Sequence, residues 1–141
     1  MSCVLRVWGS NFNVDDFFTN SSIHPINIWH RGEPKFKSNP KSKTKDNSGC
    51  TIELSSANFS ELNVQIQQTI NFCNSHKEFL TNLVSYTGVE HAVADFGVQN
   101  KPDAWCSYQF DKELLSLLSE IGISLCVSVY PVEMENNEKE T

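Results

Sequence analysis

Alternating apolar and polar residues predict β-strands in several parts of the chain. In the run CVLRVW, Cys3, Leu5 and Val7 would share one buried face, because successive side chains of a strand point to opposite faces. Four later runs are also β-prone, and glycine, proline or aspartate residues bound them. In the last of these runs, the alternation predicts that Val127 is a core residue. The predicted strands cover residues 3–8, 50–55, 89–98, 104–110 and 123–130.

Apolar residues at helical spacing predict helices between these strands. Asn13 can cap a short helix over residues 14–19. A stripe of apolar residues spaced three or four apart predicts two consecutive helices, or one bent helix, over residues 60–86. Asp111 can cap a last helix, with Leu117 among its core residues and a glycine at its end.

The order of the predicted elements indicates the fold class. From residue 50 onward the order is strand, helix, strand, strand, helix, strand, which is typical of the ferredoxin-like split βαβ fold. Right-handed crossovers would place the helices on one face of an antiparallel or mixed sheet. The sequence therefore predicts a single α+β domain over residues 1–132, with an extra N-terminal strand and a short helix.

Two segments fall outside this pattern. Residues 35–49, KFKSNPKSKTKDNSG, are rich in lysine, serine and asparagine, which predicts a flexible basic surface loop or a long hairpin tip. Residues 133–141 are acidic and lack a core pattern, so we expect a disordered tail there.

The net charge of −6 is unevenly distributed along the chain. Residues 31–45 contain six basic residues and one acid, a charge of +5, whereas five bases and sixteen acids give the remainder −11. An acidic body attracts basic partners, although an acidic surface is also an ordinary way for a protein to stay soluble. The charge alone leaves both interpretations open.

The five cysteines predict neither disulfides nor a zinc site, because their number is odd and no two lie close together in the sequence. Cys3, Cys73, Cys106 and Cys126 lie in apolar patterns and are predicted to be buried free thiols. Free thiols suit a reducing compartment, and no apolar run is long enough to span a membrane. Because MSCVLRVWGS has no basic leader, we expect no signal peptide and a soluble cytoplasmic protein.

Motifs for catalysis or cofactor binding are not recognisable in the sequence. His24, His30, His76 and His91 are not at metal-ligand spacing, and glycine-rich nucleotide loops and elbow serines are missing. His91 and Asp95 would share one face of a strand, either as an acid–base pair or as part of a solvent-facing polar side. We therefore expect no metal, no cofactor and no enzymatic activity.

Nucleic-acid binding is considered because lysines and aromatic residues lie together. The lysines of residues 35–49, with Trp29 and Phe36, could contact a phosphate backbone. The acidic body and the lack of a nucleic-acid motif speak against this interpretation. We do not expect a nucleic-acid partner.

The most distinctive stretch is IHPINIWHRGEP, which predicts a short extended piece ending in a glycine turn. Trp29, His30 and Arg31 would form a recognition edge, since Trp and Arg dominate binding hot spots. Alternatively, Trp29 packs on a neighbouring element and Arg31 pairs locally with Glu33.

Several motifs of the chain resemble one family. The start LRVWG and FNVDDFF, a central P-x-x-x-W-x-R-G-E element and the closing ELLSLLSEIGISLCVSVYP are similar to the bacterial domain-of-unknown-function 4279 family. The central element comprises Pro25, Trp29, Arg31, Gly32 and Glu33. The resemblance covers about residues 3–131 and implies a small α+β bacterial protein, but no reaction, because none is established for the family.

Two hypotheses of function follow. The first is a non-catalytic protein-binding domain, a monomer or weak dimer, such as an immunity protein that neutralises a basic toxin delivered between cells. The alternative is a small-molecule or nucleotide-sensing module with a pocket between the sheet and residues 31–49. The candidate partner-binding residues are Trp29, His30, Arg31, Glu33, Glu53, Glu90 and Glu120.

Overall fold

A five-stranded mixed sheet lies at the centre of the structure, in the strand order β2-β5-β1-β6-β7. The computed structural model of the chain describes residues 1–131, so the expected tail at residues 133–141 lies outside the described residues. Neighbouring strands are antiparallel, except that β6 and β7 are parallel. The strands are β1 (Cys3–Gly9), β2 (Asn27–Trp29), β5 (Ser48–Ser55), β6 (His91–Gln99) and β7 (Ser124–Tyr130).

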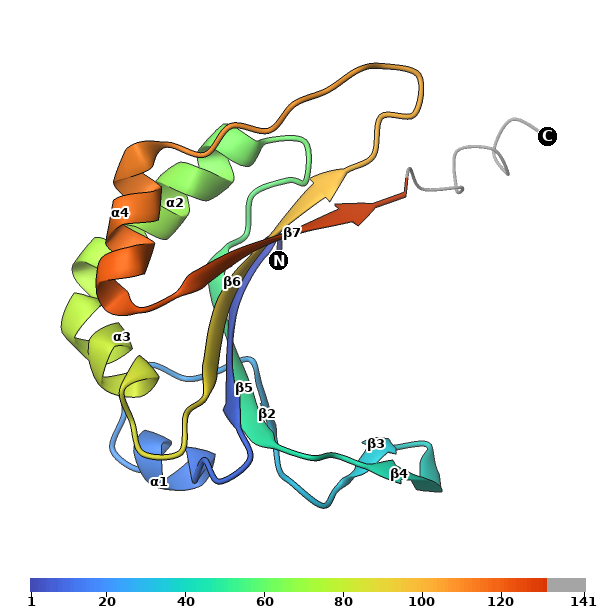
Figure 1. Cartoon of the computed structure of the whole chain (residues 1–141), viewed down its shortest axis with the longest axis vertical. Coiled ribbons are helices and arrows are strands. Elements are labelled where there is room, and N and C mark those ends of the chain that lie inside the picture. Colours follow the sequence, from blue (N-terminus) through green and yellow to red (C-terminus); the bar gives the residue numbers. More distant parts are fainter. Residues whose placement is uncertain (132–141) are drawn as a thin grey trace.

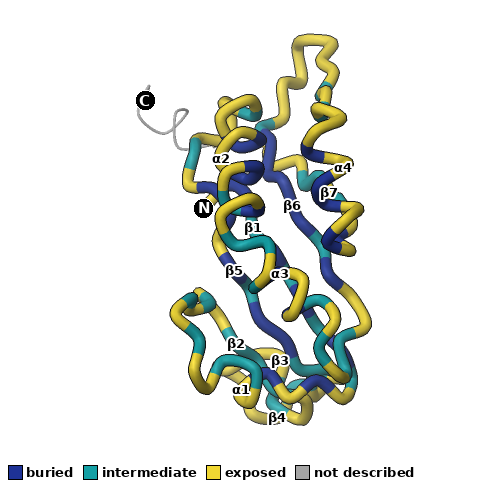
Figure 2. Tube along the Cα trace, turned by 90° about the vertical axis from the view of Figure 1, so that its left-hand side faces the viewer, coloured by how far each residue is buried: buried dark blue, intermediate teal, exposed yellow. Residues whose placement is uncertain are grey.

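Helices cover one face of this sheet, and a further short helix lies at one end of the sheet (Figure 1). Buried residues gather on the strands and on the helix sides that face them (Figure 2). The expected α+β class, with its helices on one face of a mixed sheet, is therefore confirmed. The helices are α1 (Val14–Phe18), α2 (Leu62–Ser75), α3 (Lys77–Val84) and α4 (Lys112–Ile121).

The helix boundaries follow local signals in the sequence. The Asn13 side chain accepts a hydrogen bond of 3.2 Å from the Asp16 backbone N–H, which confirms the predicted cap of α1. α2 and α3 are separate helices that meet at His76. Asp111 stands at the N-cap position of α4, although its side chain makes no capping bond, and Gly122 ends the helix in a left-handed conformation with φ of 101°.

The prediction of a strand over residues 104–110 is wrong. These residues pair with no strand, and Trp105 is 93% exposed. The place beside β6 is taken instead by β7, which α4 connects to β6 in a parallel crossover. The ferredoxin-like arrangement is therefore not confirmed, and β1 is the central strand rather than an addition to that arrangement.

The basic segment forms a β-hairpin of its own. Its strands β3 (Pro34–Phe36) and β4 (Asn39–Thr44) pair as a separate two-stranded sheet. The hairpin projects from the end of β5 toward the side of the central sheet that lies away from the helices (Figure 1). Of the two predicted forms, loop or hairpin, the structure contains the hairpin, and its mobility stays a prediction.

Burial along β7 decreases toward its end, contrary to the prediction that Val127 is a core residue. Ile123, just before the strand, is buried, Val127 is only partly buried and Val129 is 57% exposed. The reason is that β7 is an edge strand whose C-terminal part extends beyond the helix layer (Figure 1).

The cysteines differ in burial from the prediction. Cys3, Cys50 and Cys73 are buried, and burial raises the pKa of the first two thiols to about 12 and that of the third to about 11. Cys106 and Cys126 are exposed, which corrects their expected burial. Cys106 lies in the segment that forms no strand, and Cys126 points to the side of the sheet that the helices leave open.

Candidate functional site

The second face of the central sheet carries no helix among residues 1–131, and we call it the uncovered face (Figure 1). The alternation of β1 explains it, because the buried Cys3, Leu5 and Val7 face the helices and the residues between them point the other way. Strand register then determines which residues share this face. The uncovered face comprises Val4, Arg6, Trp8, Asn27, Trp29, Gly49, Thr51, Glu53, His91, Val93, Asp95, Gly97, Gln99, Ser124, Cys126, Ser128 and Tyr130.

Three rings form an aromatic cluster at one end of this face. Trp29 of β2 lies across Gly49 of β5, so that a Cβ on Gly49 would be 2.5 Å from Trp29 Cζ2. The same Cβ would be 2.8 Å from Trp8 Cβ, which places Trp8 on the other side of the glycine. Trp8 in turn stacks on His91 with ring centroids 5.0 Å apart. Trp29 Nε1 donates a hydrogen bond of 2.7 Å to Asn47 Oδ1, which holds its indole in place.

A charged network occupies the middle of the face. Arg6 Nη1 lies 2.6 Å from Asp95 Oδ2, and Ser128 Oγ donates a 2.7 Å hydrogen bond to Asp95 Oδ1. Side chains of the two neighbouring strands, β1 and β7, thus satisfy the Asp95 carboxylate of β6, and Asp95 is only 6% exposed. His91 is not its partner, so the acid–base pair considered from the sequence does not form.

Two further aromatic rings lie at the other end. Phe59, from the connection between β5 and α2, covers Gly97, where an added Cβ would be 2.5 Å from its Cε1. Phe59 also contacts Tyr130 of β7, with ring centroids 5.0 Å apart. Both rings remain partly exposed. The uncovered face therefore has aromatic groups at both ends and a neutralised ion pair between them.

The residues that follow Trp29 hold the adjoining turn together. His30 Nε2 lies 2.7 Å from Asp15 Oδ2, and its Nδ1 lies 2.5 Å from Glu33 Oε1. The hydrogen bond to Glu33, and then that to Asp15, raise the pKa of His30 above its ordinary value of 6.5. Arg31 Nη1 donates to the Ser10 carbonyl at 3.3 Å. The expected pair between Arg31 and Glu33 does not form, because Glu33 bonds to His30 instead.

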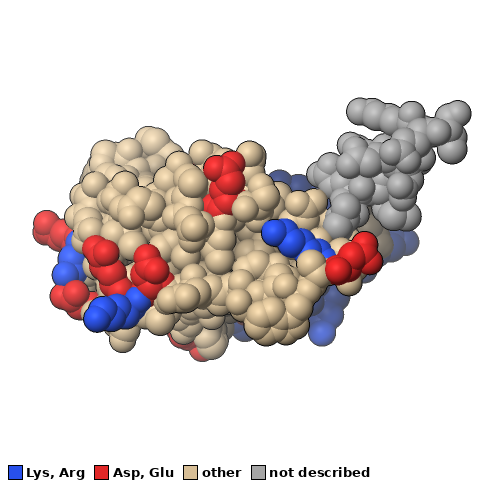
Figure 3. Space-filling view, turned by 90° about the horizontal axis from the view of Figure 1, so that it is seen from above, with Lys and Arg blue, Asp and Glu red and all other residues tan. Residues whose placement is uncertain are grey.

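The other three candidate acids, Glu53, Glu90 and Glu120, are not brought together. Glu53 lies on the uncovered face, and Glu120 pairs with Lys77 in the helix layer at 2.7 Å. Glu90 accepts hydrogen bonds from the backbone N–H and the hydroxyl of Ser10, which lower its pKa. Figure 3 shows, for one end of the molecule, that charged side chains stand in separate small groups with uncharged surface between them.

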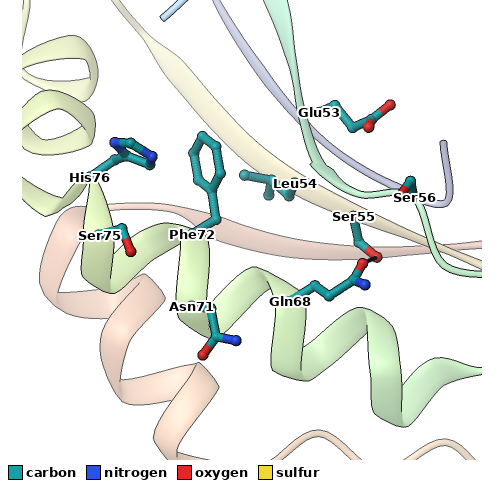
Figure 4. Close-up of a pocket in the computed structure, with 9 residues that line it drawn as sticks. All are labelled: Glu53, Leu54, Ser55, Ser56, Gln68, Asn71, Phe72, Ser75 and His76. Atoms are coloured by element: carbon teal, nitrogen blue, oxygen red, sulfur yellow. Dashed lines mark hydrogen bonds between the residues drawn. The ribbon is translucent and has the colours of Figure 1, made fainter.

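A groove lies between the C-terminal part of β5 and α2 (Figure 4). Its volume is about 470 Å³, and most of the residues that line it are polar. Ser55 Oγ donates a 2.6 Å hydrogen bond to Gln68 Oε1 across it, while Leu54 and Phe72 provide apolar surface. Within residues 1–131, no group of His, Cys, Asp and Glu side chains is arranged to hold a metal ion. None of the helices in this range has the length and apolar character to cross a membrane.

One of the three comparisons with known proteins gives a match. The family described as Domain of unknown function (DUF4279) matches residues 1–132. The chain belongs to this family. No curated protein and no solved structure matches it. Since the description of the DUF4279 family states no activity, the function of this DUF4279 chain has to be argued from its geometry.

Sequence reasoning identified only part of the site in this DUF4279 protein. It singled out Trp29 and the shared face of His91 and Asp95, but not Gly49 or Arg6. The alternation of β1 was a usable signal for Arg6, because it placed that residue and Trp8 on the face opposite the core. No local signal could find Gly49, since its role depends on a strand from another part of the chain.

Proposed function

We propose that this DUF4279 protein is a non-catalytic protein-binding domain and that the uncovered face is its binding surface. The observation that carries the proposal is the aromatic cluster of Trp29, Trp8 and His91 on a sheet face without helices. Partly exposed tryptophan and arginine side chains are the groups that contribute most to protein interfaces. Their hydrogen bonds hold them in place, so little side-chain entropy is lost on binding.

The partner class that we propose is a toxin delivered between neighbouring bacterial cells, which makes the chain a cytoplasmic immunity protein. An inhibitor of this kind needs a preformed surface that covers the toxin. The net charge of −6 favours encounter with a basic toxin, because opposite potentials steer association. Glu53 is the exposed acid of the uncovered face that would meet such a partner. The lysines of the β3–β4 hairpin would then lie at the border of the interface.

The test uses the toxin encoded beside this chain in its host and measures binding by calorimetry at two salt concentrations. We expect W29A and E53K each to weaken binding at least about tenfold, the loss typical of a hot-spot residue. E120K is the matched control, since Glu120 is exposed in the helix layer and its ion pair is worth little. Melting temperatures of all variants verify folding. Binding that is insensitive to W29A and E53K would refute the uncovered face as the site.

Small-molecule sensing is a second candidate, and the groove between β5 and α2 favours it. The groove has a volume within the range of ligand pockets, and the amide of Gln68 lies in its wall. It lies apart from residues 31–49, where the sequence hypothesis placed the pocket. A rise in melting temperature with a nucleotide or metabolite, lost in Q68L, would favour sensing, whereas no rise with any compound would speak against it.

A further inference from the structure

The outer edge of β7 presents backbone groups that no other strand within residues 1–131 pairs with. Among residues 1–131, β7 pairs only with β6. The Tyr130 carbonyl accepts a hydrogen bond of 2.7 Å from the Asn100 N–H, so Tyr130 directs its backbone groups toward β6. Because backbone groups alternate in direction along a strand, the N–H and C=O groups of Leu125, Val127 and Val129 point away from the sheet.

This edge has none of the features that usually prevent strands from pairing. Exposed edges are commonly protected by short strands, prolines or charged side chains. At the opposite edge of the sheet, β2 has only three residues and follows Pro25, and Glu53 places a charge farther along β5. β7, in contrast, is seven residues long, SLCVSVY, without a charge or a proline. Near the end of β7, Val129 is 57% exposed.

We infer that β7 pairs antiparallel with β7 of a second copy of this chain, so that the protein is a dimer with a twofold axis at Val127. In this register Val127 faces its own equivalent, and Leu125 faces Val129 of the second copy. Each of these pairs consists of residues with outward-pointing backbone groups and would exchange two backbone hydrogen bonds. The two five-stranded sheets would become one continuous sheet.

The side chains of β7 are compatible with this pairing on both faces. On the helix side, only Leu125, Val127 and Val129 meet, and the exposed Val129 becomes covered. On the other side, Cys126 of one copy faces Ser128 of the second copy. No like charges oppose each other, since β7 contains no charged residue. A second copy can therefore satisfy the outward-pointing backbone groups of β7 without a clash between the side chains of the two strands. This inference is independent of the proposed function, because it uses the edge of the sheet and not its uncovered face.

The first test is the oligomeric state of the full chain, measured by sedimentation equilibrium over a range of concentrations. We expect the wild type to dimerise and V129K to be monomeric, because the lysine places a charge against an apolar strand. I26K is the matched control: Ile26 is 48% exposed and precedes β2 at the opposite edge. Circular dichroism verifies that both variants fold. A monomeric wild type, or a V129K variant as dimeric as the wild type, would overturn the inference.

The second test examines the register by disulfide formation. Positions 126 and 128 of the two copies form non-hydrogen-bonded pairs, whose Cα atoms are about 4.5 Å apart, within the range of disulfides. Under mild oxidation S128C should give a covalent dimer through Cys126 of the second copy. S124C adds a thiol to the same strand, but that thiol faces Tyr130 of the second copy, so the S124C variant should not form a covalent dimer. Equal cross-linking of both variants, or of neither, would contradict this register.

Discussion

The indole of Trp29 lies over Gly49 of the neighbouring strand, close enough that a Cβ on the glycine would be 2.5 Å from Trp29 Cζ2. β2 and β5 are paired at this position. The glycine therefore leaves room for the indole beside Trp8, because a Cβ at residue 49 would also clash with the Val7 carbonyl oxygen and be 2.8 Å from Trp8 Cβ.

We predict that G49A displaces Trp29 and destabilises the protein by about 1–3 kcal/mol, the usual cost of inserting a group into a packed site. Urea unfolding would give the loss of stability, and tryptophan fluorescence would shift to longer wavelength as the indole becomes more exposed. T51V, on the same strand and face, is the control, because it changes the side-chain volume very little. An unchanged spectrum in G49A would show that Trp29 does not depend on the glycine.

A second prediction compares two apolar residues that the sequence alone treats alike. L117A should cost about 2–5 kcal/mol, because Leu117 is buried in the core between α4 and the sheet. V127A should cost about 1 kcal/mol or less, because Val127 on the edge strand is only partly buried and loses fewer contacts. Urea unfolding at low protein concentration measures both. Similar losses in the two variants would contradict the difference in burial.

The third prediction concerns the β3–β4 hairpin, whose two strands pack mainly on each other. Replacing residues 35–44 by a short Gly-Ser link should lower the melting temperature only slightly, since the cost of loop closure depends weakly on length. Replacing residues 35–49 should lower it much more, because this change also removes Asn47, which holds Trp29, and the first residues of β5. Equal decreases in melting temperature after the two replacements would contradict the prediction that the hairpin itself contributes little to stability.

The fourth prediction follows from the raised pKa of His30. A group whose pKa is higher in the folded state stabilises that state fully below its unfolded pKa, and the contribution disappears as the pH rises through the folded pKa. The urea midpoint should therefore decrease as the pH rises above the ordinary histidine pKa of 6.5, and H30Q should reduce this decrease. H24Q is the control, because His24 is exposed and makes no ion pair among the described residues. An H30Q variant with the pH dependence of the wild type would contradict the network of His30 with Glu33 and Asp15.

The elements that the sequence predicts correctly are those with strong local periodicity. The alternation in CVLRVW identified the buried face of β1, and the cap at Asn13 and the stop at Gly122 were visible as single residues. The strand predicted at residues 104–110 failed because alternation alone does not provide a partner. A run becomes a strand only when a neighbouring strand can satisfy its backbone groups, and β7 occupies that place beside β6.

The sequence by itself determined the α+β class, the three regions that contain the described helices, most of the apolar sides that form the core and the position of the basic segment. Only the tertiary structure decided that β1 lies between β5 and β6, because strand order depends on contacts between residues far apart in the chain. The pairing of Arg6 with Asp95, 89 residues later, has the same origin. The uncovered face also depends on the tertiary structure, because a periodic pattern shows that a strand has two faces but not which elements will cover them.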